Sequence, residues 1–374
     1  MSVIVGIGTA NPDYKLSQEE AYAFMKEFYS LDEDEGNRLS ALYKRSGIKQ
    51  RYSCVPDYNQ QLQQKKLFPD TPDLTPFPNI ERRMAIYAEE APLLSEKAIT
   101  NLYAQLNASS YNTQHITHLI TVSCTGMSAP GLDLMLLEKL QLAPHTQRTS
   151  VNFMGCYAAV HALKMAHQIC TAQTNAQVLI VCVELCSLHF QNVKSSDNIT
   201  ANAIFADGAA ACLMVGDDLA KHNAPHLLVK GFYSEVHASG KKDMAWQISS
   251  SGFLMTLSAY IPQFIEAAIA DLIARALSHY GVQKTAIEHW AIHPGGRKIL
   301  DVTLAKLSLN QQDLAYSYQV LKEYGNMSSP TILFVLKAMM DDHLLSGNIF
   351  GTAFGPGLTM ETFLFAKNSS IHES

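Results

Sequence analysis

The segment that decides the fold is SVNFMGCYAAVHALKMAHQIC, residues 150–170. A short β-prone run meets Gly155, and an alanine-rich helical pattern begins directly after Cys156. The pattern predicts a strand, a tight glycine turn and a helix, with the thiol at the helix N-terminus. Unpaired N–H groups and the helix dipole favour a thiolate there, which is the nucleophilic form of cysteine. A buried structural cysteine would explain the same segment equally well.

The rest of the chain has the rhythm of an α/β protein. Short apolar runs such as Val178–Leu185 alternate with longer helical patterns such as Tyr157–Thr171 and Thr331–His343. With 374 residues, of which 47% are apolar, the chain is long enough for two halves around a broad core. A polar segment at 216–225 lies between two predicted strands. We therefore expect one half at 1–220 and the other at 221–374.

Composition argues against several classes of function. The net charge is −6, so no global positive field attracts nucleic acid or an anionic membrane. The N-terminal MSVIVGIGTANP lacks the basic region of a signal peptide, and no apolar run reaches the roughly 20 residues of a membrane helix. We expect a cytoplasmic protein without membrane insertion. Its seven cysteines are expected to be reduced thiols.

Two further motifs supply polar groups that fit a reactive thiol. WAIHPGGR, residues 290–297, places His293 at a strand end before a bend that lets a ligand approach the backbone. YGNMSSP, residues 324–330, places Asn326 in a turn ahead of a helix. Each residue alone has an ordinary structural explanation. Together with Cys156, they fit a nucleophile with a base and an oxyanion donor.

Five motifs in a fixed order resemble those of the type III polyketide synthases, the chalcone synthase-like family. They are GCYAA at 155–159, NAIFADGAAA at 202–211, HPGG at 293–296, YGNMSS at 324–329 and FGPGLTMET at 354–362. The resemblance implies a thiolase-like α/β fold, in which two similar α/β halves form a layered αβαβα arrangement. It also implies a homodimer that uses acyl-CoA and malonyl-CoA as substrates and needs no cofactor or metal.

The same resemblance assigns the chemistry. Cys156 matches the nucleophile that carries the acyl group, and His293 and Asn326 match the pair that holds the thioester carbonyl. Decarboxylation of malonyl-CoA leaves an enolate, whose oxygen two neutral N–H donors would stabilise. An imidazolium at His293 would also keep Cys156 ionised. The enolate then attacks the acyl-cysteine in a Claisen condensation.

Residues of the substrate channel follow from the same comparison of motifs. Phe205 matches the aromatic residue between the CoA channel and the cavity, and Met255 falls where the family has a second gating phenylalanine. The loop near the C-terminus contributes Gly355 and Pro356. A basic stretch at 38–51 resembles the phosphate-binding helix of the family, and its best matches are Arg38 and Arg45.

Small residues at three pocket positions favour a long starter. These positions are Thr125, Ala129 and Cys186, as in members that resemble bacterial alkylpyrone and alkylresorcinol synthases. Small side chains leave room for an alkyl chain, of which each buried methylene contributes about 0.8 kcal/mol. We therefore expect a fatty acyl-CoA starter and products of the pyrone or resorcinol type.

Several alternatives remain open at this point. A ketoacyl synthase III-like enzyme that extends an acyl carrier protein also uses Cys, His and Asn, and a chalcone or stilbene-type synthase would take an aromatic starter. A catalytically inert subunit of the same fold would act as a binding partner. Zinc at Cys182, Cys186 and His189 lacks a fourth ligand, and the role of His189 is unassigned. GIG at 6–8 lacks the third glycine of a dinucleotide loop.

Overall fold

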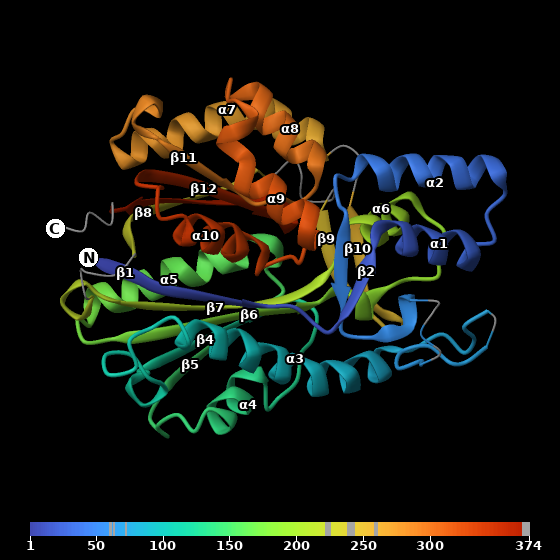
Figure 1. Cartoon of the computed structure of the whole chain (residues 1–374), viewed down its shortest axis with the longest axis horizontal. Helices are drawn as coiled ribbons and strands as arrows, with labels where there is room; N and C mark the ends of the chain where they lie inside the picture. Colours follow the sequence, from blue (N-terminus) through green and yellow to red (C-terminus); the bar gives the residue numbers. More distant parts are fainter. Residues whose placement is uncertain are drawn as a thin grey trace.

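The computed structural model describes residues 1–59, 62, 64–71, 73–220, 226–237, 244–257 and 261–368. Helices and sheets stack in five layers (Figure 1). The strands are β1 Ser2–Ala10, β2 Tyr14–Ser17, β3 Gln50–Ser53, β4 His118–Ser123, β5 Gln147–Asn152, β6 Gln177–Leu185, β7 Asp207–Gly216, β8 Leu227–Val236, β9 Met244–Ser249, β10 Gly252–Leu257, β11 His289–Ile292, β12 Gly347–Gly355 and β13 Thr359–Lys367. The helices are α1 Gln18–Phe28, α2 Glu33–Arg45, α3 Ile80–Tyr103, α4 Leu132–Lys139, α5 Ala158–Ala172, α6 Ser196–Ile204, α7 Ile261–Tyr280, α8 Arg297–Lys306, α9 Ala315–Tyr324 and α10 Thr331–Asp341.

The large sheet consists of two half-sheets that meet at β1. The strand order is β11-β12-β13-β8-β1-β7-β6-β4-β5. Strand β1 pairs with β7 from end to end, whereas it pairs with β8 only at Ser2–Ile4. The N-terminal half-sheet therefore contains β1 and β4 to β7, and the C-terminal half-sheet contains β8 and β11 to β13.

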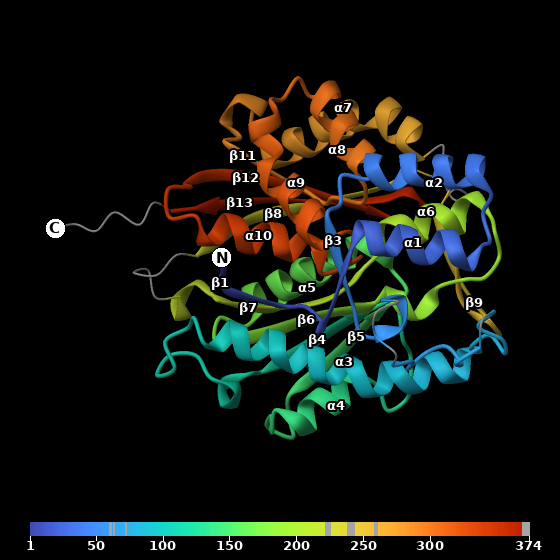
Figure 2. The ribbon, with the colours of Figure 1, turned by 45° about the vertical axis from the view of Figure 1, so that its right-hand side comes forward.

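Helices α5 and α10 form the middle layer between the half-sheets (Figures 1 and 2). Four alanines of α5, at positions 158, 159, 162 and 166, are fully buried, because small side chains let a helix pack against sheets on more than one side. Helix α3 covers the outer face of the N-terminal half-sheet, and α7 and α8 cover that of the C-terminal half-sheet. The expected αβαβα layering is confirmed.

A separate β-hairpin closes one end of these layers. Strands β9 and β10 pair only with each other in the described part of the chain. The hairpin packs against α6 and against the loop that follows β12. It therefore lies beside the turn that carries the nucleophile candidate.

The predicted division of the chain at residues 220 and 221 stays a prediction. Strand β7 ends at Gly216 and β8 begins at Leu227, so the chain passes from the N-terminal half-sheet to the C-terminal half-sheet between these residues. Residues 221–225 lie outside the described residues. In the described part of the chain, no helix is both long and apolar enough to cross a membrane.

Candidate active site

Cys156 lies in a single 3-10 turn, Gly155–Tyr157, that leads directly into α5, as the sequence predicts. Gly155 has a φ of +80°, a conformation that favours glycine. A Cβ atom at Gly155 would also lie 2.2 Å from Cδ of Pro356, and one at Gly355 would lie 2.6 Å from Cδ1 of Tyr157. The loop after β12 thus packs tightly against the cysteine turn and fixes where the thiol points.

His293 lies one residue beyond β11 and is 1% exposed. Its backbone N–H donates to the carbonyl of Thr352 at 2.8 Å, which continues the strand pairing. Neither ring nitrogen has a partner among the described residues. Buried polar groups in proteins are rarely left unpaired, so the imidazole is suited to a bound molecule that supplies the partner.

Asn326 is held in the turn between α9 and α10. Its backbone N–H donates to the carbonyl of Ile204, and its own carbonyl accepts from Ala206, both at 2.9 Å. The side-chain Nδ2 donates to the carbonyl of Gly295 at 3.1 Å, and Oδ1 accepts from the backbone N–H of Ser328 at 2.8 Å. The amide is therefore fixed in orientation before any substrate arrives.

The three side chains share one cavity of about 420 Å³. Cys156 comes from the N-terminal half, whereas His293 and Asn326 come from the C-terminal half. The thiol Sγ lies 3.6 Å from Oγ of Ser328. The structure therefore meets the geometric condition on which the predicted roles depend, namely a common cavity.

Most of the other predicted channel residues lie where the sequence places them. Side chains that line the cavity are those of Thr125, Cys186, Phe205, Met255 and Pro356. Gly355 lies behind Pro356, against Tyr157. Arg45 lines the cavity as well, whereas Arg38 is an exposed residue of the same helix outside the cavity lining.

Ala129 requires a correction. It does not line the cavity of its own chain but borders a different depression, together with Met127 and Arg148. The chain turns outward after Thr125, so that residues 127–130 are exposed. The expectation that Ala129 lines the pocket is therefore wrong for the cavity of its own chain.

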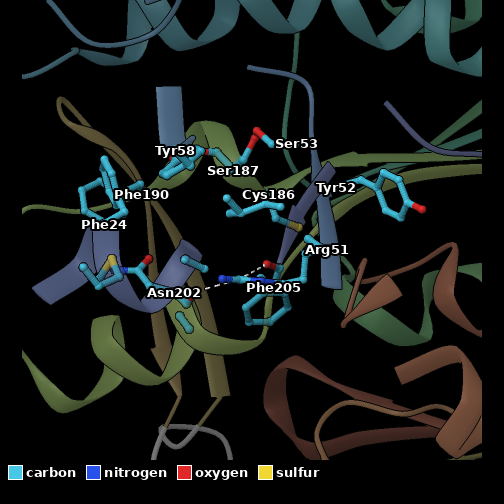
Figure 3. A pocket seen from close by; sticks show the side chains of 15 residues that line it. Phe24, Arg51, Tyr52, Ser53, Tyr58, Cys186, Ser187, Phe190, Asn202 and Phe205 are labelled. Carbon is cyan, nitrogen blue, oxygen red and sulfur yellow. Dashed lines mark hydrogen bonds between the residues drawn. The ribbon is translucent and has the colours of Figure 1, made fainter. Parts of the chain in front are cut away.

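A smaller cavity of about 60 Å³ lies behind Phe205 and Cys186 (Figure 3). These two side chains line both cavities and separate them. Nη1 of the buried Arg51 donates to the carbonyls of Asn202 and Phe205, each at 2.7 Å. Arg51 thus anchors the backbone that carries Phe205.

Another small cavity, of about 40 Å³, also borders Cys186.

Cys182, Cys186 and His189 do not form a metal site. No group of three or more potential ligands for a metal ion occurs among the residues that the structure describes. Nδ1 of His189 accepts from the backbone N–H of Phe253 at 3.1 Å, so Nε2 carries the proton and donates to the carbonyl of Thr125 at 2.6 Å. The role of His189 is to tie the hairpin to the cavity wall.

Burial favours the neutral forms of Cys156 and His293 in the free protein. It raises the pKa of Cys156 to about 11, although hydrogen bonds with Ser328 and Asn326 act in the opposite direction. Burial also lowers the pKa of His293 to about 3. Burial thus disfavours the imidazolium form of His293 that would keep Cys156 ionised. The neutral imidazole retains one N–H donor for an oxyanion.

Glu184 is a buried carboxyl group behind the cysteine that the sequence analysis missed. One carboxylate oxygen accepts from the backbone N–H of Cys124 and from Oγ1 of Thr125, both at 2.9 Å, and the other accepts from Oγ of Ser329 at 2.7 Å. Burial raises the pKa of Glu184 to about 7, and its negative charge raises the pKa of Cys156. The sequence signal for Glu184 was the presence of a charged residue within the apolar run of β6.

Replacing Glu184 by glutamine is expected to shift alkylation of Cys156 to lower pH. The Glu184 carboxyl loses its proton as the pH rises through about 7, and the resulting charge opposes the thiolate. Glutamine keeps the size and an acceptor oxygen but stays neutral. The measurement is the iodoacetamide labelling rate against pH, with Cys156→Ala as the control for the other six thiols. An unchanged profile would remove Glu184 from the electrostatics of the nucleophile.

Comparison with known proteins agrees with this geometry. A family model described as "Chalcone and stilbene synthases, N-terminal domain" matches residues 1–218, and its C-terminal counterpart matches residues 233–368. The chain belongs to the chalcone and stilbene synthase family. It is thus a type III polyketide synthase, an acyl-transferring condensing enzyme that acts on CoA thioesters without a cofactor.

Relatives of this synthase span nearly its whole length. The Mycobacterium tuberculosis protein "Alpha-pyrone synthesis polyketide synthase-like Pks18" is 30% identical, covering 98% of this chain and 91% of its own. The "Putative chalcone synthase" of Bacillus subtilis is 27% identical, covering 98% and 99%. The crystal structure of PKS-I from the brown alga Ectocarpus siliculosus superposes with a TM-score of 0.88 at 30% identity, covering 98% of each chain.

Proposed function

We propose that this synthase loads a fatty acyl-CoA starter on Cys156 and extends it with malonyl-CoA to pyrone or resorcinol-type products. The main observation behind this proposal is that the thiol of Cys156, the unpartnered imidazole of His293 and the oriented carboxamide of Asn326 line one cavity. The similarity to a protein described as an alpha-pyrone synthesis polyketide synthase supports the product class.

Loading begins with proton transfer from Cys156 to His293. The low pKa of His293 makes the imidazolium short-lived, so the transfer is expected to be concerted with thiolate attack on the thioester carbonyl. The carbon–sulfur bond to CoA then breaks, and the departing CoA thiolate takes the proton from His293. The enzyme is left as an acyl-cysteine with a neutral imidazole.

Extension uses the same imidazole as a hydrogen-bond donor. Malonyl-CoA loses carbon dioxide, and the electron pair of the broken carbon–carbon bond forms an enolate. The His293 N–H and the Asn326 amide donate to the enolate oxygen, where preorganised donors contribute most. The enolate carbon attacks the acyl-cysteine carbonyl, the bond to Sγ breaks, and the Cys156 thiolate is released for the next cycle.

The starter class is tested most directly by product analysis. Mass spectrometry of reactions with malonyl-CoA and a panel of short, long and aromatic acyl-CoAs should show alkyl pyrones or resorcinols from the long chains. Turnover of aromatic starters alone would instead indicate a chalcone or stilbene-type synthase. A requirement for malonyl carrier protein in place of malonyl-CoA would indicate a ketoacyl synthase.

Replacing Cys186 by phenylalanine is expected to penalise long starters more than short ones. Cys186 borders the main cavity and both small cavities behind it, so a larger ring would block the way between them. Exclusion of two methylenes costs about 1.6 kcal/mol, or roughly a tenfold loss in kcat/KM. The measurement compares kcat/KM for two chain lengths. Cys186→Ala, which stays small, should keep the original preference, and an equal loss for both lengths would refute the alkyl site.

We also propose a homodimer that forms along β5. This strand is the last of the sheet, and the side chains of residues 147–150 are exposed. An exposed edge strand offers unpaired backbone groups to a second strand. The neighbouring Met127 is 47% exposed, and the depression that includes Ala129 borders the same strand. The molar mass in solution tests this assembly.

The cytoplasm is the compartment that we propose for this synthase. All seven cysteines are free in the structure. Free thiols persist in reducing compartments, whereas secreted proteins usually pair them.

A further inference from the structure

We propose that Arg297 and Lys298 form, opposite Arg45, the second wall of a subsite for the diphosphate of the CoA substrates. Arg38 then takes the 3′-phosphate. The inference rests on the proposed function, because it concerns the CoA thioesters of that reaction. It assigns roles to two cations that the motif comparison did not single out.

The three cations gather on one rim of the cavity although they come from different halves of the chain. Arg45 is the last residue of α2, and Arg297 and Lys298 are the first two residues of α8. All three are exposed and line the cavity that holds Cys156. A Cβ at Gly47 would lie 3.1 Å from Cδ of Arg297, so this side chain rests on the loop just beyond Arg45.

The rim has few acidic partners of its own. Within the described residues, the only ion pair of Arg297 is with Asp301 at 3.6 Å, and both side chains are 51% exposed. Such an exposed ion pair contributes little to the stability of the protein. Over the same residues, no ion pair involves Arg45 or Lys298. In a protein with a net charge of −6, a local cluster of one sign is therefore available to an anionic ligand.

The charged and uncharged parts of a CoA thioester match the positions of these cations at the cavity rim. Its pantetheine arm must enter the cavity for the thioester to reach Cys156, which leaves the adjoining diphosphate at the rim. The bend at Gly295 and Gly296 leaves space there, because a Cβ at Gly296 would meet nothing within 4 Å. Arginine and lysine both donate charge-assisted hydrogen bonds to phosphate oxygens.

Arg38 is placed for the outer phosphate. It precedes Arg45 by seven residues on α2, which puts both side chains on the same helix face, about 10 Å apart along the axis. Arg45 lines the cavity, but Arg38 does not. The 3′-phosphate is attached to the ribose beyond the diphosphate, so it falls on the Arg38 side of the rim.

The test compares three forms of one starter: its CoA thioester, its dephospho-CoA thioester and its N-acetylcysteamine thioester. The double variant Arg297→Ala/Lys298→Ala is expected to raise KM for both nucleotide thioesters at least tenfold, with kcat nearly unchanged. The N-acetylcysteamine thioester has no phosphate, so the rate at which it acylates Cys156 in the absence of malonyl-CoA should not change. Arg38→Ala should raise KM for the CoA thioester but not for the dephospho form.

Lys306→Ala is the matched control, because this cation lies at the opposite end of the same helix and pairs with Glu266. Titration calorimetry with CoA alone gives a second readout that needs no turnover. An unchanged KM for the CoA thioester, or equal losses with the N-acetylcysteamine thioester, would overturn the diphosphate subsite. Failure of the wild-type protein to turn over any thioester would instead refute the proposed function, while the calorimetry would still test the phosphate contacts.

Discussion

Cys156→Ala is expected to abolish acyl loading while malonyl-CoA decarboxylation stays measurable. The substitution removes the sulfur that is proposed to carry the chain, but His293 and Asn326 still line the same cavity. In the proposed mechanism these two donors stabilise the enolate, so the decarboxylation does not require the nucleophile. Intact-protein mass spectrometry after incubation with acyl-CoA measures loading, and carbon dioxide release measures decarboxylation.

A matched control for this variant lies on the same helix. Cys170 is buried near the other end of α5 and lies outside the cavity lining. Cys170→Ala should therefore load acyl groups as the wild type does. An acyl adduct that persists in Cys156→Ala would show that another thiol is the nucleophile.

His293→Ala is expected to slow decarboxylation by roughly 10²- to 10³-fold, the usual cost of losing one oxyanion donor. The imidazole ring has no hydrogen-bond partner among the described residues, so its removal leaves none of them unpaired and should not impair folding. The substitution is best made in the Cys156→Ala background, where carbon dioxide release reports the enolate step alone. A thermal unfolding curve confirms that the variant is folded.

His289→Ala provides the comparison, because His289 is the first residue of the strand that His293 follows, and it bonds to the backbone of Ser346 instead of lining the cavity. It should leave the rate of carbon dioxide release unchanged. If His293→Ala retained the full rate, the developing charge would have to be stabilised by Asn326 and other groups, and the proposed role of His293 would fail.

Local sequence was sufficient to predict the turn at Cys156 and an α/β architecture, whereas the αβαβα layering came from motif resemblance. The glycine, the alanine-rich helix and the apolar strands each have one low-energy arrangement, and that arrangement depends mostly on neighbours in the chain. The positions of His293 and Asn326 came from motif resemblance. Their meeting with Cys156 depends on contacts between the two halves, which no local pattern encodes.

The errors have physical causes of the same kind. Ala129 lies in a motif that borders the cavity at Thr125, but the backbone leaves the cavity within a few residues. Burial disfavours the imidazolium form of His293, and a sequence does not display burial. Arg297 follows the HPGG motif directly, and its charge was the sequence signal for the proposed second cationic wall of the cavity, which the motif comparison did not include.

The division of the site between the two half-sheets has a consequence for synthesis on the ribosome. The nucleophile leaves the ribosome well before the segment with the imidazole and the carboxamide, and N-terminal parts of a chain generally fold first. A nascent first half therefore displays the Cys156 thiol without its proposed proton acceptor, His293. Cys156 should stay unreactive toward cellular thioesters until the second half has docked, so that premature acylation of an unfinished chain is avoided.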